Sequence, residues 1–130
     1  MRILVDTNVL FSALLFPKSV PSEALKHVVD NHDLFLCKQN VEELREIIAR
    51  KAPEYLPSLA DFLATLPFTS ISDSSRSQVT IRDETDQPII NAAMNASIDL
   101  VITGDKDFLA MELPKPMCIT PKQYLERFAS

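Results

Sequence analysis

Short, wholly apolar runs alternate along the chain with longer segments in which apolar residues recur every three or four positions. A short continuous apolar run is typical of a strand covered on both faces, and the longer spacing is typical of an amphipathic helix. Strands that alternate with helices favour an α/β fold with a mainly parallel sheet. The predicted strands are Ile3–Val5, Leu34–Cys37, Phe68–Ile71, Leu100–Thr103 and Met117–Ile119.

Capping residues mark where the intervening helices begin. Ser22 is a predicted N-cap, and Asn40 followed three residues later by Glu43 is close to a capping box. The segment Thr120–Gln123 has an N-cap threonine, a proline at the first helical position and a glutamine at the third, which predicts a closing helix. The other predicted helices run from Thr7 to near Pro17, through Leu59–Leu66, and from Asp86 to Met94.

Length and composition predict one globular domain over residues 1–130. The 130 residues are 46% hydrophobic and 24% charged, enough for a single buried core. The first strand starts at Ile3, which leaves no room for a secretion leader, and the apolar run Val9–Phe16 is too short to span a membrane. We therefore expect a cytoplasmic protein with no membrane partner. Cys37 and Cys118 each lie in an apolar run and are expected to be buried, reduced thiols.

Charge and glycine content narrow the possible functions. The net charge of −5 has the wrong sign for a protein that binds nucleic acid over its whole surface. It is compatible with a nucleic-acid enzyme if the excess acid surrounds a metal ion. Gly104 is the single glycine, which excludes the glycine-rich dinucleotide-binding and phosphate-binding loops.

Four acids, Asp6, Glu43, Asp86 and Asp105, lie near junctions between predicted strands and helices. Each has a structural explanation by itself: a helix cap for Asp6 or Asp86, a capping-box partner of Asn40 for Glu43, and a turn residue for Asp105. Taken together, they point to the edge of a parallel sheet where ligands bind. Carboxylates gathered there repel one another unless a cation joins them, and hard oxygen ligands suit Mg²⁺ or Mn²⁺. The sequence therefore predicts a divalent-metal site.

Other polar residues accompany these acids: Asn8, Thr103, Asp83 and Asp107. The asparagine and the threonine are candidates to orient the acids, and the two aspartates could be outer-shell or water-mediated ligands. Lys106, Arg82 and Arg45 are candidates to attract phosphate or, equally, solvated helix ends. His27 and His32 lack companion ligands and are expected at the surface.

Four segments together resemble a PIN domain, and the branch they resemble is the VapC-like toxins of bacterial toxin–antitoxin systems. The segments are Val5–Leu10, Glu42–Ile48, Asp83–Asp86 and Val101–Leu109. The resemblance covers essentially the whole chain. It implies a three-layer α/β/α sandwich, a Mg²⁺- or Mn²⁺-dependent endoribonuclease, an RNA substrate, a possible antitoxin partner and a homodimer.

The same resemblance implies roles for individual residues. Asp6, Glu43, Asp86 and Asp105 match the four acids of the family, with Asp107 accessory and Asn8 and Thr103 supporting. Where relatives often have Asp-Pro-Asp-Asp, this chain has Asp83-Glu84-Thr85-Asp86, which leaves open which aspartate binds metal.

Two alternatives remain. A phospho-receiver domain also gathers acids at a sheet edge and binds Mg²⁺. It needs an aspartate after a middle strand, however, where this chain has Lys38-Gln39-Asn40, although Lys122 is near the place of its lysine. The other alternative is a PIN fold that binds partners without catalysis, and the presence of all four acids argues against it.

Overall fold

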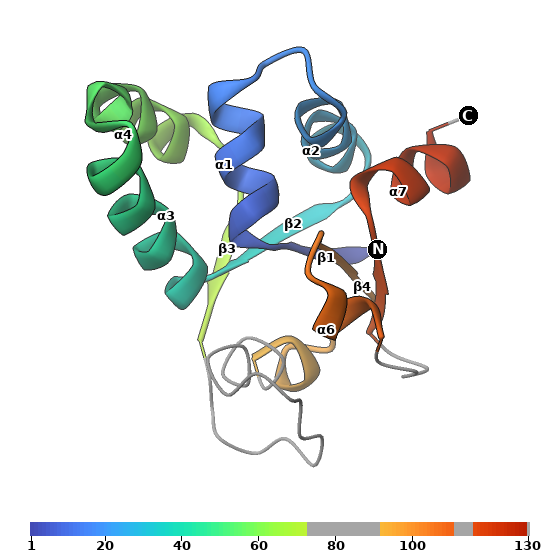
Figure 1. Ribbon diagram of the computed structural model, residues 1–130. Coiled ribbons are helices and arrows are strands. Elements are labelled where there is room, and N and C mark those ends of the chain that lie inside the picture. Colours follow the sequence, from blue (N-terminus) through green and yellow to red (C-terminus); the bar gives the residue numbers. More distant parts are fainter. Residues whose placement is uncertain (73–91, 111–115, 130) are drawn as a thin grey trace.

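The computed structural model describes residues 1–72, 92–110 and 116–129. Within them, five parallel strands form one sheet in the order β3-β2-β1-β4-β5 (Figure 1). The strands are β1 (Arg2–Val5), β2 (Asp33–Cys37), β3 (Thr69–Ile71), β4 (Leu100–Ile102) and β5 (Met117–Ile119). Every strand predicted from the apolar runs is therefore present, and the predicted parallel sheet is confirmed.

The order of the strands reverses beside β1. The chain passes outward from β1 to β2 to β3 and then returns to place β4 on the other side of β1. Leu4 at the centre of β1 is accordingly in register with Phe35 on one side and Val101 on the other. In open parallel sheets this reversal leaves a crevice at the carboxyl ends of the two strands, where ligands usually bind.

Helices cover both faces of the sheet, so the three-layer α/β/α arrangement is confirmed (Figure 1). One face carries α1 (Thr7–Leu15), α2 (Val20–Asn31), α3 (Lys38–Lys51), the 3-10 helix η1 (Pro53–Tyr55), α4 (Leu56–Thr65) and α7 (Pro121–Phe128). The other face carries α6 (Lys106–Leu109) and the helical residues 92–95. The predicted helix from Asp86 to Met94 lies largely outside the described residues. None of the described helices is long and apolar enough to cross a membrane.

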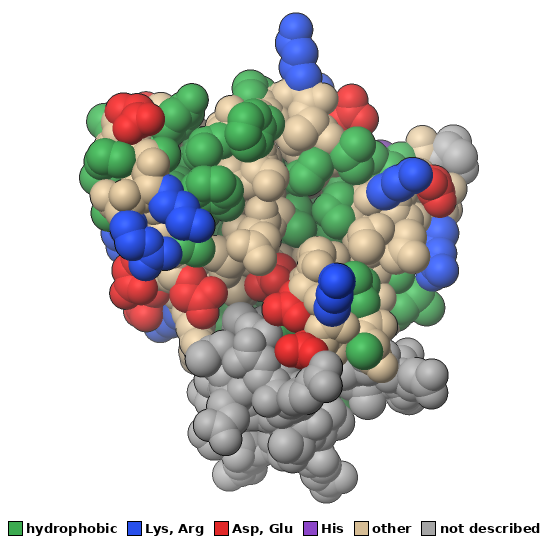
Figure 2. All heavy atoms as spheres, in the orientation of Figure 1, with side chains coloured by type: hydrophobic (Ala, Val, Ile, Leu, Met, Phe, Trp, Pro, Cys, Tyr) green, Lys and Arg blue, Asp and Glu red, His purple; other side chains and the backbone are tan. Residues whose placement is uncertain are grey.

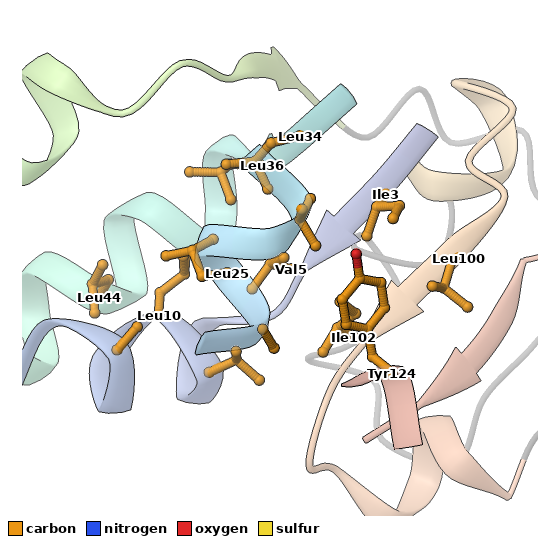
Figure 3. Packing of buried hydrophobic residues seen from close by; sticks show 14 of the residues in the cluster. Ile3, Val5, Leu10, Leu25, Leu34, Leu36, Leu44, Leu100, Ile102 and Tyr124 are labelled. Carbon is orange, nitrogen blue, oxygen red and sulfur yellow. The ribbon is translucent and has the colours of Figure 1, made fainter. Parts of the chain in front are cut away.

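Alternate residues of the central strands supply two separate apolar clusters. Ile3 and Val5 pack with Ile102 against the larger helical layer, where Figure 3 shows them beside Tyr124. Leu4 faces the other way, into a cluster with residues of β2, β4 and α6. Because both faces of each strand are buried, successive residues must all be apolar. This is the physical reason for the continuous apolar runs in the sequence.

The larger cluster also accounts for the apolar residues on α1 and α4. Leu14 and Leu63 are both partly buried against it. Core packing therefore explains their apolar character without a subunit interface.

Two helix starts differ from those predicted. Helix α2 begins at Val20, and its N-cap is Ser19, whose hydroxyl accepts a hydrogen bond from the backbone N–H of Ser22 at 3.3 Å. Ser22 was therefore wrongly predicted as the cap, because Ser19, two residues before Pro21, and Ser22, directly after it, are both good capping residues. Helix α3 begins at Lys38, directly after β2, so Asn40 lies within the first turn and does not cap it.

The two histidines are not simple surface residues, which corrects the prediction from their lack of companion ligands. Both are half-buried between α2 and α7. The Nδ1 atom of His27 is 2.6 Å from the hydroxyl of buried Tyr124, and the ring of His32 lies edge-on to Phe128. Desolvation lowers the pKa of His32. The histidines therefore help to attach the closing helix to the core.

The two cysteines were expected to be buried, reduced thiols. Cys37 is buried and Cys118 is half-buried, and they form no disulfide with each other.

The capping box of α7 gives a test of the fold. The Thr120 hydroxyl accepts from the Gln123 N–H at 3.1 Å, and the Gln123 side chain accepts from the Thr120 N–H at 2.9 Å, as the sequence predicts. We expect Thr120→Ala to lower the free energy of unfolding by about 1 kcal/mol, because a helix N–H loses its partner. Urea denaturation measures this change.

Thr65→Ala is the matched control for this substitution. The exposed Thr65 hydroxyl donates to backbone carbonyls of its own helix, at Asp61 and Phe62, so its removal is expected to change stability by less than about 0.5 kcal/mol. Equal losses in the two variants would contradict the role given to the capping box.

Candidate active site

Asp6 is the residue at which β1 ends and α1 begins. Its backbone N–H donates to the carbonyl of Ile102 at 3.0 Å, which continues the pairing of β1 with β4. Its Oδ1 accepts the N–H of Thr7 at 2.8 Å, so the side chain caps α1. The residue is only 6% exposed, an unusual burial for an acid.

The second oxygen of Asp6 is held from the neighbouring strand. The hydroxyl of Thr103, just after β4, donates to Asp6 Oδ2 at 2.8 Å and accepts the N–H of Asp105 at 3.0 Å. Thr103 is fully buried, so its hydroxyl has to be paired inside the protein. One hydroxyl therefore connects the ends of β1 and β4 and sets the position of Asp105.

On the other side, Asp6 is connected to α3. The Nδ2 atom of Asn40 lies 3.2 Å from Asp6 Oδ1 and 2.8 Å from the Thr7 hydroxyl. The Thr7 hydroxyl lies 3.1 Å from Glu43 Oε2, where it can donate. Asp6 and Glu43 thus share Thr7 and Asn40 as hydrogen-bonding neighbours.

The acids affect one another's ionisation. Desolvation raises the pKa of Asp6 and the charge of Asp105 raises it further, against the hydrogen bonds from Thr103, Thr7 and Asn40. Desolvation also raises the pKa of Glu43, with the charge of Asp6 adding to it and the bond from Thr7 opposing it.

The negative charge of Asp6 also affects the ionisation of the Cys118 thiol on β5. Its burial, with the charge of Asp6 as a smaller cause, raises its pKa to about 11. Negative charge is therefore concentrated around Asp6.

The remaining candidate residues are placed as follows. The backbone N–H of Asp107 donates to Asp105 Oδ1 at 2.8 Å, so Asp105 caps α6 and Asp107 belongs to the same turn. Asn8 is exposed on the first turn of α1, and the donors to the Asp6 side chain within the described part of the chain are Thr7, Asn40 and Thr103. Asp83 and Asp86 lie outside the described residues.

The donor set fits a hard divalent cation. It consists of carboxylate oxygens around a desolvated acid, the ligand chemistry that Mg²⁺ and Mn²⁺ prefer. Among the residues described, however, no three acidic, histidine or cysteine side chains are close enough together to hold an ion. Asp6, Glu43 and Asp105 therefore do not form a metal site by themselves in the described part of the chain, and Asp86, the fourth acid predicted from the sequence, lies outside it.

A surface hollow of about 490 Å³ adjoins Glu43. It lies at the start of α3, and its lining is Cys37, Lys38, Gln39, Glu42, Glu43, Glu46 and Ser72. Figure 2 shows acidic side chains gathered on this face between the start of α3 and α6. Of the candidate acids described, Glu43 is the one that lines this hollow, so the hollow gives a ligand access to Glu43 from the α3 side.

A family model of the PIN domain matches residues 2–107 of the chain. The chain belongs to the PIN domain family. PIN domains are generally nucleases that use divalent metal ions, and the matched region contains all four candidate acids. Membership of the PIN domain family also excludes the phospho-receiver alternative, because phospho-receiver domains belong to a different family.

Two known proteins resemble this PIN domain over nearly its whole length. The uncharacterized protein MJ1680 of Methanocaldococcus jannaschii is 28% identical, over 98% of this chain and 92% of the relative. A chain in the crystal structure of VapBC2 from Rickettsia felis, bound to a DNA fragment from their promoter, superposes with a TM-score of 0.63. That match covers 92% of this chain and 97% of the other at 16% identity, which establishes a shared fold.

Sequence reasoning missed Asn40 and Thr7 as members of the site. Asn40 was assigned to capping, yet it is fully buried and hydrogen-bonded to Asp6. One signal was available: Asn40 precedes Glu43 by three residues, so the two share a face of the helix. Asparagine is also a poor helix former, which makes its presence inside a first turn informative.

The buried carboxylate predicts a pH-dependent stability. A pKa raised in the folded state means that protonated Asp6 stabilises the fold below the ordinary value of 3.8, and that this stability is lost as pH rises through the folded pKa. We expect metal-free wild type to lose stability relative to Asp6→Asn by up to about 1.4 kcal/mol per pH unit in that window. Urea unfolding in chelator from about pH 4 to about pH 8 measures this difference.

Asp61→Asn removes the same charge from an exposed position on α4. Its stability curve is expected to run parallel to that of wild type. If the Asp6→Asn curve is also parallel, Asp6 does not carry the pH dependence.

Proposed function

We propose that this PIN domain is a metal-dependent endoribonuclease that hydrolyses RNA phosphodiester bonds and acts as the toxin of a toxin–antitoxin pair. The observation that carries the proposal is the buried Asp6 at the reversal of strand order, joined through Thr103 to Asp105 and through Thr7 to Glu43. A fold-stabilising cap alone does not require hydrogen bonds that link one buried acid to two others. The charge of Asp105 disfavours ionised Asp6, and the charge of Asp6 disfavours ionised Glu43, which supports a site where a cation offsets these charges.

Asp6, Asp86 and Asp105 are the proposed metal ligands, and Glu43 completes the set or positions the attacking water. A bound Mg²⁺ or Mn²⁺ would activate water and neutralise charge on the scissile phosphate. The chain's own contribution is to fix the carboxylates before substrate arrives. Thr103 and Thr7 each tie a carboxylate to a second structural element, which limits its rotation.

In-line attack would leave a 5′-phosphate and a 3′-hydroxyl, as the family resemblance implies. Glu43 is well placed to position the attacking water, because it is half-buried and borders the surface hollow. Desolvation raises the pKa of Glu43, which makes its carboxylate a better proton acceptor than an exposed glutamate.

The partners follow from the same proposal. RNA is the substrate, and the fold shared with a chain of the VapBC2 complex supports a cognate antitoxin. A homodimer in the cytoplasm is the state we propose, by resemblance to the family. Because the net charge of −5 repels phosphate overall, attraction has to come from individual cations, and exposed Lys106, which follows Asp105, is the first candidate.

Cleavage of RNA in Mn²⁺ tests the catalytic assignment. We expect Asp6→Asn and Asp86→Asn each to lower kcat/KM by roughly 100-fold or more, because the metal supplies several kcal/mol of transition-state stabilisation. A chelator should abolish wild-type cleavage, and added Mn²⁺ should restore it. Gel analysis of end-labelled RNA measures the rate and identifies the new ends.

Asp61→Asn is the charge-matched control and should cleave RNA at the wild-type rate. Equal rates for wild type and Asp6→Asn would remove Asp6 from catalysis. Wild-type protein that cleaves no RNA in Mn²⁺ would instead favour the PIN fold as a binding module.

Lys106 provides a separate test of substrate binding. If its ammonium attracts phosphate in both ground and transition states, Lys106→Ala should raise KM for RNA by roughly 3-fold to 10-fold with little change in kcat. The effect should shrink at high salt, because screening weakens the attraction in the wild type. Steady-state kinetics at two salt concentrations measure both effects.

Lys26→Ala removes an equally exposed lysine from α2 and should leave KM unchanged. The same KM in the Lys106 and Lys26 variants would return Lys106 to the role of a solvated helix end.

A further inference from the structure

Asn40 is a polar side chain that is fully buried, and its position in α3 does not explain why a polar residue is found there. It lies in the first turn of α3 with no exposed surface, and its Oδ1 atom has no hydrogen-bond partner among the described residues. Burying an amide with one atom unpaired costs about 1–3 kcal/mol. An apolar residue at this position would avoid that cost, so the asparagine is explained by what its amide nitrogen does.

Both protons of this nitrogen have acceptors. Nδ2 lies 3.2 Å from Asp6 Oδ1 and 2.8 Å from the Thr7 hydroxyl. An ionised carboxylate can only accept, which places the amide nitrogen, and not its oxygen, toward Asp6. Thr7 can then use its own proton for Glu43 Oε2 at 3.1 Å. Asn40 therefore donates directly to the carboxylate of Asp6, and through the Thr7 hydroxyl it is linked to the carboxylate of Glu43.

These bonds divide the two oxygens of Asp6 between different roles. Oδ1 receives two donors, the N–H of Thr7 and the amide of Asn40, and Oδ2 receives one, the hydroxyl of Thr103. A carboxylate offers about four lone-pair sites, two on each oxygen. Within the described residues, Oδ1 is therefore saturated and Oδ2 keeps one position for a further ligand.

We propose that Asn40 is a positioning residue that saturates Asp6 Oδ1 and orients Thr7 toward Glu43, so that Asp6 Oδ2 is left to bind the divalent cation. This role rests on the proposed function. Asn40 acts through Asp6 and Thr7. Its loss removes one of the two donors to Asp6 Oδ1, so the carboxylate is held less firmly, and it lets the Thr7 hydroxyl turn away from Glu43. Metal affinity should then fall even though every ligand is still present.

Asn40→Leu tests this role, because leucine keeps a similar volume and burial but donates no hydrogen bond. We expect Mn²⁺ binding to weaken roughly 10-fold to 100-fold, the usual effect of losing an outer-shell partner. We expect kcat to fall while KM for RNA stays within about 2-fold. Asn40→Thr keeps one donor and should lie between Asn40→Leu and wild type. Free Mn²⁺ counted by electron paramagnetic resonance gives the affinity without any activity measurement.

Asn31→Leu is the matched control. The Asn31 amide is exposed on α2 and donates to the carbonyl of His27 in its own helix, so this variant should bind Mn²⁺ as wild type does. Wild-type affinity in Asn40→Leu would overturn the positioning role and leave the proposed function standing. Wild-type protein with no Mn²⁺ affinity and no cleavage would overturn both.

A measurement on wild type decides the question if the variants do not fold. Titration with Mg²⁺, which is diamagnetic, should shift the side-chain NH₂ resonances of Asn40. One of these protons is donated to Asp6 Oδ1, and Oδ2 of the same carboxylate is the proposed metal ligand. The NH₂ resonances of Asn31 should not move. Asn40 resonances that stay fixed while Mg²⁺ binds would overturn the proposal.

Discussion

The candidate site depends on keeping one carboxylate, that of Asp6, buried at the end of the central strand. A buried acid needs hydrogen-bond donors, and those of Asp6 come from the start of α1, from Thr103 after β4 and from Asn40 in α3. These elements are separated by up to 97 residues in the chain. The donors meet only when the parallel sheet is assembled with β4 beside β1, so the candidate site is a product of the whole fold.

This arrangement works against stability. Desolvation and the neighbouring charge of Asp105 both disfavour ionised Asp6, and desolvation likewise disfavours ionised Glu43. A protein selected for stability alone would place a neutral cap at position 6, such as asparagine or serine. Acids retained where they weaken the fold indicate a function that needs their charge, and a cation would relieve the repulsion.

The sequence predicts the sheet better than the site. Strands such as Ile3–Val5 are covered on both faces, so the sequence shows each of them as a continuous apolar run. The capping box at Thr120 is also visible in the sequence, because its contacts lie within four consecutive residues. Ser22 was mistaken for Ser19 because a serine beside a proline is ambiguous by itself. The contacts of Asn40 with Asp6 and of His27 with Tyr124 join residues that are 34 and 97 positions apart in the chain, so the spacing of neighbouring residues does not identify these partners.

The competing explanations of Asp6 from the sequence, helix cap or metal ligand, turn out to be compatible. Its Oδ1 caps α1, while its Oδ2 faces the hydroxyl of Thr103 at the end of β4. Asp105 shows the same pattern, since its Oδ1 caps α6 beside the site. A cap fixes the rotamer of the side chain, and a fixed rotamer is what an ion-binding carboxylate requires. In a parallel sheet the helices begin where the strands end. An aspartate that caps such a helix is therefore already held in one rotamer at the edge of the sheet where ligands bind.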